Sequence, residues 1–396
     1  MGSNNGGTAV LSLKYGVLTG RKNKSTMGIK EEFVDLSIAH QLGDVSNRRL
    51  SQSLEAKEYA SNASSKMSLM WDHSTASPHG LNDWQPARET RAKWWVKNQK
   101  HKNSEKIVFA LKALLKADAN FDFLVDMQDH RTRNMILPDG QVAPVFAFNR
   151  PISKDTGHIL WPLPKYHDLD DPEFLGKLDP DRVDWHAKKD MAVWRGIPGN
   201  RGSLSGQARA MRLLPLLRKF KSGEFSAEET TAILSSMPRY RFLMKWIDDP
   251  RFDVGYTDAT GIVVADEPFI NPFGRPKIPR EAFQDYKYIL VLPGNDVGSS
   301  FYWTMNSGSV GLVVNCDFET FATHHFKPWE HYVPIRRDQA NVDRMMRWCA
   351  NHQDECQAIA KRAQEKCKFL ADRDLRDQIN KGVVGKVREE LAQIKT

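Results

Sequence analysis

Short apolar runs alternate with longer helical patterns through the second half of this sequence, and no other feature constrains the fold as strongly. The expected strands are 192–194, 288–292, 310–314 and 333–335. The expected helices are 206–220, 297–306, 339–370 and 375–394. Strands that alternate with helices predict an α/β architecture with parallel sheets. In such sheets ligands bind at the carboxyl ends of the strands, so candidate site residues are sought there.

The first half shows a weaker form of the same pattern. A clear amphipathic helix is expected at 104–117, followed by strands at 121–127 and 143–148. Residues 1–30 are rich in Gly, Asn, Ser and Lys, which is typical of a flexible tail. Residues 31–100 combine patchy helical periodicity with an irregular, tryptophan-containing stretch, and we expect an extension there.

Composition excludes several classes of protein. With 40% hydrophobic and 27% charged residues in 396, the chain has a globular rather than a disordered composition. Four cysteines exclude a disulfide-built scaffold, and we expect Cys349, Cys356 and Cys367 to be buried free thiols on one helical face. No apolar run reaches the roughly 18 residues of a membrane span. No secretory signal is visible at the N-terminus, so the sequence leaves the compartment open.

The first candidate site follows the expected strand 288–292. It is the stretch Gly294-Asn295-Asp296-Val297-Gly298-Ser299-Ser300, which opens the expected helix. Glycines allow a tight turn, amides at a helix N-terminus attract anions, and the two serines add hydroxyl donors. An ordinary capped turn would have the same sequence, so an anion site and a structural turn remain alternatives.

The second candidate follows the expected strand 192–194. Arg195, Gly196 and Arg201 belong to a glycine-containing loop at this strand end. Guanidinium groups bind phosphate through paired hydrogen bonds, which suggests a phosphate site. Solvated arginines on a surface loop are the alternative.

The third candidate closes the expected strand 121–127, in the stretch Asp126-Met127-Gln128-Asp129-His130. A carboxylate at a strand end can act as a general base on a hydroxyl, whereas Asp126 can equally be a turn residue. Asp129 and His130 do not complete a set of metal ligands. The Asp-x-Asp triplets at 168–170, 179–181 and 372–374 do not follow apolar strands, so we expect arginine and amides, not Mg²⁺, to hold a diphosphate.

Taken together, three blocks of the sequence resemble glycosyltransferase family 90, the capsule-associated type that includes Rumi-like protein O-glucosyltransferases and fungal xylosyltransferases. The blocks are Trp185-x-x-Lys188 with Ala192-Val193-Trp194-Arg195-Gly196, the stretch 286–309 with Gly294-Asn295-Asp296-Val297, Trp303 and Ser307-Gly308-Ser309, and Lys327-Pro328-Trp329-Glu330-His331-Tyr332-Val333-Pro334. A looser match at 125–130 places the catalytic aspartate of Rumi-like members on Asp129. The Pro328-Trp329 pair is expected to be part of the core rather than a ligand contact.

The resemblance implies a GT-B-like fold, in which two Rossmann-like lobes face a cleft and C-terminal helices pack across them. The expected division is a tail at 1–30, an extension at 31–100, an acceptor-side lobe at 101–190, a donor lobe at 191–370 and a final helix at 371–396. The implied reaction moves a hexose or pentose, glucose or xylose, from a UDP-sugar to a hydroxyl of a protein or glycan, with inversion and without a metal. The base would be Asp129, and the donor would be held by Arg195, Gly196, Arg201, Gly294, Asn295, Asp296, Gly298, Ser299 and Ser300.

One departure from the family affects the donor site. Rumi-like members carry an arginine in the helix after the donor-site glycine, and other branches carry a basic residue before the tryptophan, where this chain has Tyr302. Diphosphate binding is therefore expected to depend on Arg195, Arg201 and helix amides. The departure also leaves a second hypothesis, a family member that binds sugar nucleotide or glycan without turnover.

Two further points concern partners and location. A net charge of +8 and eleven tryptophans suggest a nucleic-acid-binding protein as a third hypothesis, but no clustered basic stripe or recognition motif supports it, and we expect no nucleic-acid partner. The resemblance implies the lumen of the ER or Golgi, an address for which this sequence carries no visible signal.

Overall fold

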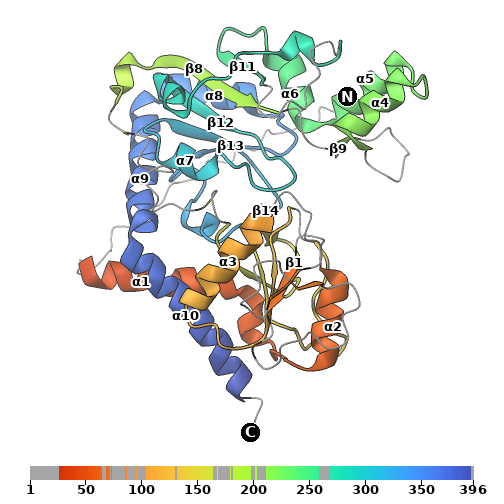
Figure 1. Ribbon diagram of the computed structural model, residues 1–396. Helices are drawn as coiled ribbons and strands as arrows, with labels where there is room; N and C mark the ends of the chain where they lie inside the picture. Colours follow the sequence, from red (N-terminus) through yellow and green to blue (C-terminus); the bar gives the residue numbers. More distant parts are fainter. Residues whose placement is uncertain are drawn as a thin grey trace, which may run out of the picture.

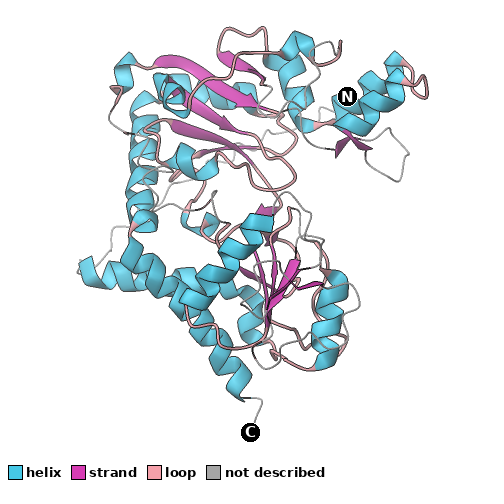
Figure 2. Cartoon of the chain, in the orientation of Figure 1, coloured by secondary structure: helices cyan, strands magenta, loops and turns pink. Residues whose placement is uncertain are grey.

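The computed structural model shows a mixed α/β protein with two separate main sheets (Figure 1), which confirms the expected class. In Figure 2 the strands form an upper and a lower group, each flanked by helices. The residues that the structure describes are 26–64, 68–71, 73, 85–86, 94–96, 104–129, 132–163, 167, 179, 182–197, 201–202, 211–257 and 268–393.

The first sheet has six strands in the order β2-β3-β1-β4-β5-β7. The strands are β1 (Ser68–Trp71), β2 (Gln85–Pro86), β3 (Trp94–Val96), β4 (Phe123–Asp126), β5 (Val145–Ala147) and β7 (His158–Leu160). Strands β4, β5 and β7 are parallel, whereas β1, β2 and β3 pair antiparallel. Helix α3 (Ser104–Lys116) packs beside β4, whose residues are all buried. Strands β1 to β3 show that part of the expected extension belongs to this sheet.

The second sheet has five parallel strands in the order β11-β8-β12-β13-β15. The strands are β8 (Lys189–Gly196), β11 (Phe252–Tyr256), β12 (Tyr286–Val291), β13 (Val310–Val314) and β15 (Val333–Ile335). Between β8 and β11 the chain forms α4 (Leu213–Lys221), α5 (Ala227–Ser236) and α6 (Pro238–Trp246). It then returns past β8 to β12, so the order of strands reverses between β8 and β12.

The two halves are joined by helices and by a small sheet. Helix α8 (Val342–Asn351) leads into α9 (Gln353–Ala371), which runs down to α10 (Arg373–Ala392) in Figure 1. Helix α10 packs against α1 (Thr26–Leu42), so the end of the chain lies beside its first described helix. Strand β6 (Arg150–Pro151) pairs with β14 (Phe318–Glu319), which links the two halves a second time.

The remaining elements are short. They are α2 (Leu54–Ala63), the strand pair β9 (Arg201–Gly202) and β10 (Met211–Arg212), and the 3₁₀ turns η1 (Gly43–Asn47), η2 (Trp185–Ala187), η3 (Asn271–Phe273), η4 (Arg280–Asp285) and η5 (Thr323–His325). Within the described ranges, no helix has both the length and the apolar composition needed to cross a bilayer.

Several elements differ from expectation. Helix α1 begins at Thr26, inside the stretch 1–30 expected to be a tail, whereas residues 1–25 lie outside the described part. The helix expected at 297–306 was wrong in length, because only α7 (Phe301–Met305) forms. Glycine disfavours helix, and the segment around Gly298 is a turn that closes when the amide of Phe301 donates to the carbonyl of Gly298 at 2.9 Å. The first residues of the expected helix 206–220 lie outside the described part.

The prediction of buried free thiols is confirmed, but the single helix expected at 339–370 is divided at His352, so the three cysteines do not share one helix. Cys349 in α8 and Cys356 and Cys367 in α9 are free and buried, and burial raises the pKa of the Cys367 thiol. Thiols buried in apolar surroundings are unreactive, so these side chains serve as small apolar core residues.

Candidate functional site

Two strand-end loops, one from each main sheet, meet at Asp129 and Asn295. The side-chain amide of Asn295 donates to Oδ2 of Asp129 at 3.3 Å. Asp126, at the end of β4, is buried and accepts from the backbone amide of Gln128 at 3.3 Å, as a turn residue does. Asp129 is exposed. Of the two carboxylates at this strand end, Asp129 is therefore the one that a ligand can reach.

A cavity of about 410 Å³ surrounds this contact, a size common among small-molecule sites. Its position is at the carboxyl ends of β8 and β12, where the strand order reverses, which is the place where open parallel sheets bind ligands. Both halves of the chain line it. The lining residues are Lys106, Asp129, Phe148, Leu163, His167, Ile197, Arg239, Gly294, Asn295, Asp296, Val297, Gly298, Ser299, Tyr302 and Thr320.

Two lining residues that could titrate are held neutral. Burial, with the positive charges of Arg376 and Lys106, lowers the pKa of His167 to about 3, and its Nδ1 accepts from the amide of Leu163 at 3.0 Å. Burial raises the pKa of Tyr302, whose hydroxyl lies 2.6 Å from Oγ1 of Thr320. Neither residue therefore supplies charge to a ligand at neutral pH.

Arg195, the cation expected at this site, does not line the cavity. Its Nη2 donates to Oδ1 of Asp253 at 2.6 Å, its Nη1 to the carbonyl of Asp253 at 2.7 Å, and its Nε to the carbonyl of Pro276 at 3.1 Å. Gly196 is also under packing constraint, because a Cβ there would lie 2.4 Å from the Trp194 ring. In this structure Arg195 and Gly196 stabilise the end of β8 through hydrogen bonds and packing.

The other expected donor residues divide into two groups. Those brought to the cavity are Gly294, Asn295, Asp296, Gly298 and Ser299. Ser300 instead lies outside the lining and accepts, through its carbonyl, from the amide of Thr304 at 2.9 Å. The backbone of Arg201 pairs with Arg212 in β9 and β10, but its side chain lies outside the described part of the structure, as does His130.

Arg239 is a cavity residue that was not predicted from the sequence. It is the second residue of α6, and its guanidinium reaches the ends of both β8 and β12. The sequence does contain helix-start signals in this region. Ser226 and Glu229 form a capping box at the start of α5, and Pro238 begins α6. Those signals predict the two helices, although they do not predict where the arginine points.

Some motif residues lie at the opposite, amino-terminal end of the second sheet. Nζ of Lys188 donates to the carbonyl of Gln284 at 2.7 Å and to Oγ of Ser309 at 3.1 Å, and that hydroxyl donates to the carbonyl of Tyr286 at 2.7 Å. Burial lowers the pKa of Lys188 to about 8. These residues tie together the starts of β8, β12 and β13, so their role is structural.

The block 327–334 builds a turn ahead of β15. Nδ1 of His331 accepts from the amide of Lys327 at 3.0 Å, and the amide of Trp329 donates to the carbonyl of Tyr332 at 2.7 Å. The Trp329 ring packs against Trp348 with centroids 4.9 Å apart. Trp329 therefore packs against the core as expected, whereas Pro328 is exposed, so the expectation that it belongs to the core was wrong.

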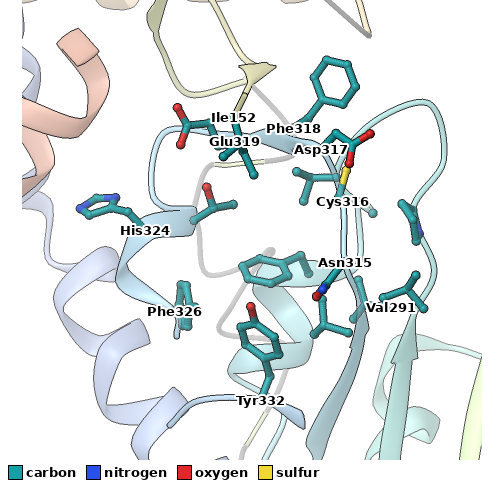
Figure 3. A pocket seen from close by; sticks show the side chains of 17 residues that line it. Ile152, Val291, Asn315, Cys316, Asp317, Phe318, Glu319, His324, Phe326 and Tyr332 are labelled. Atoms are coloured by element: carbon teal, nitrogen blue, oxygen red, sulfur yellow. The ribbon is translucent and has the colours of Figure 1, made fainter. Parts of the chain in front are cut away.

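A second cavity of about 480 Å³ adjoins the first and shares Val297 and Gly298 with it. Figure 3 shows the side chains that line it, with the Tyr332 hydroxyl pointing inward and Ile152 contributed by the first half. The amide of Ile152 donates to the carbonyl of Asp317 at 2.8 Å, so the wall of this cavity is also a link between the halves.

Of the three acidic triplets, the one at 372–374 is fully described, and it caps a helix. Asp372 caps α10 by accepting from the amides of Asp374 and Leu375, and it pairs with Lys30 at 3.0 Å. Within the part of the chain that is described, no group of three or more His, Cys, Asp or Glu side chains is placed to hold a metal ion. Residues 168–170, 180 and 181 lie outside that part.

Comparison with known proteins gives a family match and partial relatives. Residues 269–377 match the model described as glycosyl transferase family 90. The O-glucosyltransferase LpsA of Dichelobacter nodosus is 26% identical over 231 residues, which cover 56% of this chain and 55% of that protein. Protein O-glucosyltransferase 1 of Mus musculus is 29% identical over 80 residues, 20% of each chain. A glycosyltransferase structure from Rickettsia africae covers 74% of this chain and 83% of its own, at 10% identity and a TM-score of 0.34.

Proposed function

The chain carries a region of glycosyl transferase family 90, residues 269–377, and from this premise we propose that it is a glycosyltransferase. The family resemblance predicted from the sequence is thereby confirmed. Two relatives bear the name O-glucosyltransferase, which supports transfer to a hydroxyl oxygen. In the proposed reaction, glucose or xylose moves from a UDP-sugar to a hydroxyl of a protein or glycan.

The observation that carries this proposal is the contact between Asp129 and Asn295 at the wall of the cavity. It places an exposed carboxylate from the first sheet against the glycine-containing loop that follows β12. In the GT-B-like arrangement that we propose, the first half presents the acceptor and the second half binds the UDP-sugar. A carboxylate between the two substrates is where a general base must be to act on an acceptor hydroxyl.

The proposed mechanism is a direct displacement. The acceptor oxygen attacks the anomeric carbon on the face opposite UDP, and Asp129 takes its proton. The bond between that carbon and the β-phosphate oxygen breaks, and the electron pair leaves with UDP, so the configuration at carbon inverts. Asn295 holds the carboxylate in place through its amide hydrogen. We propose that protein cations and backbone amides, without a metal ion, stabilise the departing diphosphate.

A second candidate function, binding without turnover, is favoured by the environment of Arg195. Its guanidinium is engaged by Asp253, and Tyr302 stands where other branches of the family are expected to carry a basic residue. A site with weakened contacts to the diphosphate could retain affinity for a sugar nucleotide and lose the stabilisation of the leaving group.

The first test is stabilisation of the protein by UDP, GDP, CMP and dTDP, with and without EDTA. A ligand that binds only the folded state raises the melting temperature. The proposal predicts stabilisation by UDP that EDTA does not change, and hydrolysis of UDP-glucose or UDP-xylose. No response to any of the four nucleotides would contradict it, and UDP binding with no hydrolysis or transfer would favour the second candidate.

The second test separates the base from the donor site. Asp129→Asn should lower transfer or hydrolysis by about 100-fold or more while leaving UDP affinity unchanged. Asp354→Asn, which removes an exposed carboxylate from the first turn of α9, is the matched control and should change neither quantity. Full activity in a folded Asp129→Asn protein would refute the role of this residue.

A further inference from the structure

We propose that Arg239, and not Arg195, is the cation that binds the diphosphate of the sugar nucleotide. This inference rests on the proposed function and assigns the ligand contact to a residue outside the sequence blocks that resemble the family. It also answers the question raised by Tyr302, because the charge missing from the loop after β12 is supplied by a different element, α6.

The position of Arg239 is set by the ends of two strands. Its Nη1 donates to the carbonyl of Ile197 at 3.3 Å, directly after β8, and its Nη2 donates to the carbonyl of Leu292 at 3.0 Å, directly after β12. These two strands flank the point at which the strand order reverses. The guanidinium therefore spans the crevice in which a parallel sheet of this kind binds its ligand.

The guanidinium retains donors for a ligand. Arginine carries five N–H donors, and the two bonds to backbone carbonyls leave others available. Nε is buried and has no hydrogen-bond partner among the described residues. Guanidinium binds phosphate oxygens through parallel N–H bonds, so a diphosphate is the anion whose geometry matches these donors.

The charge state of Arg239 also favours binding of an anion. Burial lowers the pKa of Arg239 to about 10, while Tyr256 and Asp296 act to raise it. At neutral pH the side chain is therefore charged, and its charge is largely removed from water. A largely desolvated cation that has no close ion pair among the described residues is stabilised when an anion enters beside it.

The neighbouring residues leave room for this arrangement. A Cβ at Gly294 would lie 3.2 Å from Nη2 of Arg239, so the absence of a side chain at 294 lets the guanidinium lie against the loop. The Cζ atom of Arg239 also lies over the ring of Trp194, 5.6 Å from its centroid. Gly294, which lies in the matched region, thus allows contact with Arg239 as well as a tight turn.

The alternatives expected from the sequence are weaker. Arg195 is engaged by Asp253 and Pro276 and does not line the cavity. Helix α7 is five residues long, so its dipole contributes little to anion binding. Lys106 and Arg239 are the two cations among the described residues that line the cavity, and Arg239 is the one that contacts Leu292 and lies against Gly294.

The test measures binding of UDP and of inorganic pyrophosphate by calorimetry to the full chain and its variants. Arg239→Gln should weaken both ligands by about 10- to 100-fold, because each charge-assisted hydrogen bond is strong. Arg239→Lys keeps the charge without the paired donors and should recover part of the affinity. Arg241→Gln, on the same helix but exposed, is the matched control and should bind as the wild type does. Arg195→Gln should stay within about threefold of wild type.

The outcomes distinguish this inference from the function on which it rests. If the wild type binds UDP and a folded Arg239→Gln protein binds it equally well, Arg239 is not the diphosphate cation and the proposed function stands. If Arg195→Gln loses affinity while Arg239→Gln keeps it, the expectation from the sequence is right and this inference is wrong. If the wild type binds neither UDP nor pyrophosphate, both the inference and the proposed function fail.

Discussion

His324 is expected to make the folded protein sensitive to mild acid. It lies in η5, and its ring packs against His40 and His325 with centroids 4.0 and 3.7 Å apart. Both of its ring nitrogens are buried without a hydrogen-bond partner among the described residues. Burial, with the electrostatic influence of the neighbouring basic groups His40, His325, Lys366 and Arg150, lowers the pKa of His324 to about 2.

The sign and size of the effect follow from the two pKa values of this residue. In the unfolded chain His324 has its ordinary pKa of 6.5, so below that pH the unfolded chain binds a proton that the folded chain does not. Stability is therefore complete above pH 6.5 and falls as the pH drops toward the folded value of about 2. Between about pH 7 and about pH 5 this single group should lower the free energy of unfolding by about 2 kcal/mol.

The variant His324→Phe tests this reasoning, because phenylalanine keeps the stacked ring and removes both nitrogens without breaking a hydrogen bond. Urea denaturation at the two pH values should show the advantage of the variant over the wild type growing by about 2 kcal/mol at the lower pH. His186→Phe changes an exposed histidine and is the matched control, with no such growth expected. An advantage that is the same at both pH values would refute the depressed pKa of His324.

Three other substitutions address the site and its scaffold. Gly294→Ala should crowd the Arg239 guanidinium and lower UDP affinity by about tenfold, measured by calorimetry; unchanged affinity would show that the loop has room for a side chain. Tyr302→Phe removes the hydroxyl that bonds Thr320 and accepts from the amide of Ala322, and it should cost about 2 kcal/mol in chemical denaturation while UDP affinity is retained; a loss of affinity would place the hydroxyl on the ligand. Lys188→Met should cost about 2 kcal/mol of stability at neutral pH with nucleotide binding intact, and lost binding in a folded variant would contradict its structural role.

The sequence predicted the strands that are buried on both faces. Strands β4, β12 and β13 are runs of apolar residues that stand out without any knowledge of their neighbours. Strands β1 and β3 were missed because they form by antiparallel pairing across the sheet, with Met70 opposite Trp95, in a stretch without clear alternation. Local pattern does not encode such distant pairing, whereas the helices α5 and α6 had cap signals that could have been used.

The sequence predicted those site residues that directly follow a recognisable strand. Asp129 and the loop 294–299 were placed at strand ends, and the structure brings them together. The role of Arg195 could not be judged from the sequence, because its partner Asp253 belongs to β11, a strand that was not expected. Arg239 could not be predicted from the sequence either, because only the packing of α6 beside the sheet brings it to the ends of β8 and β12.

The positions of the motif residues in the second sheet show which features of the protein the family match supports. Within the matched region 269–377, Ser309 fastens strand beginnings at one end of the sheet, while Gly294 and Asn295 face the cavity at the other. A match over this region therefore supports the scaffold and the loop together. The two residues that decide between transfer and mere binding in our proposal, Asp129 and Arg239, both lie outside it. A protein could keep the matched region intact and lose the chemistry through either of them, which is why the experiments above change these two residues.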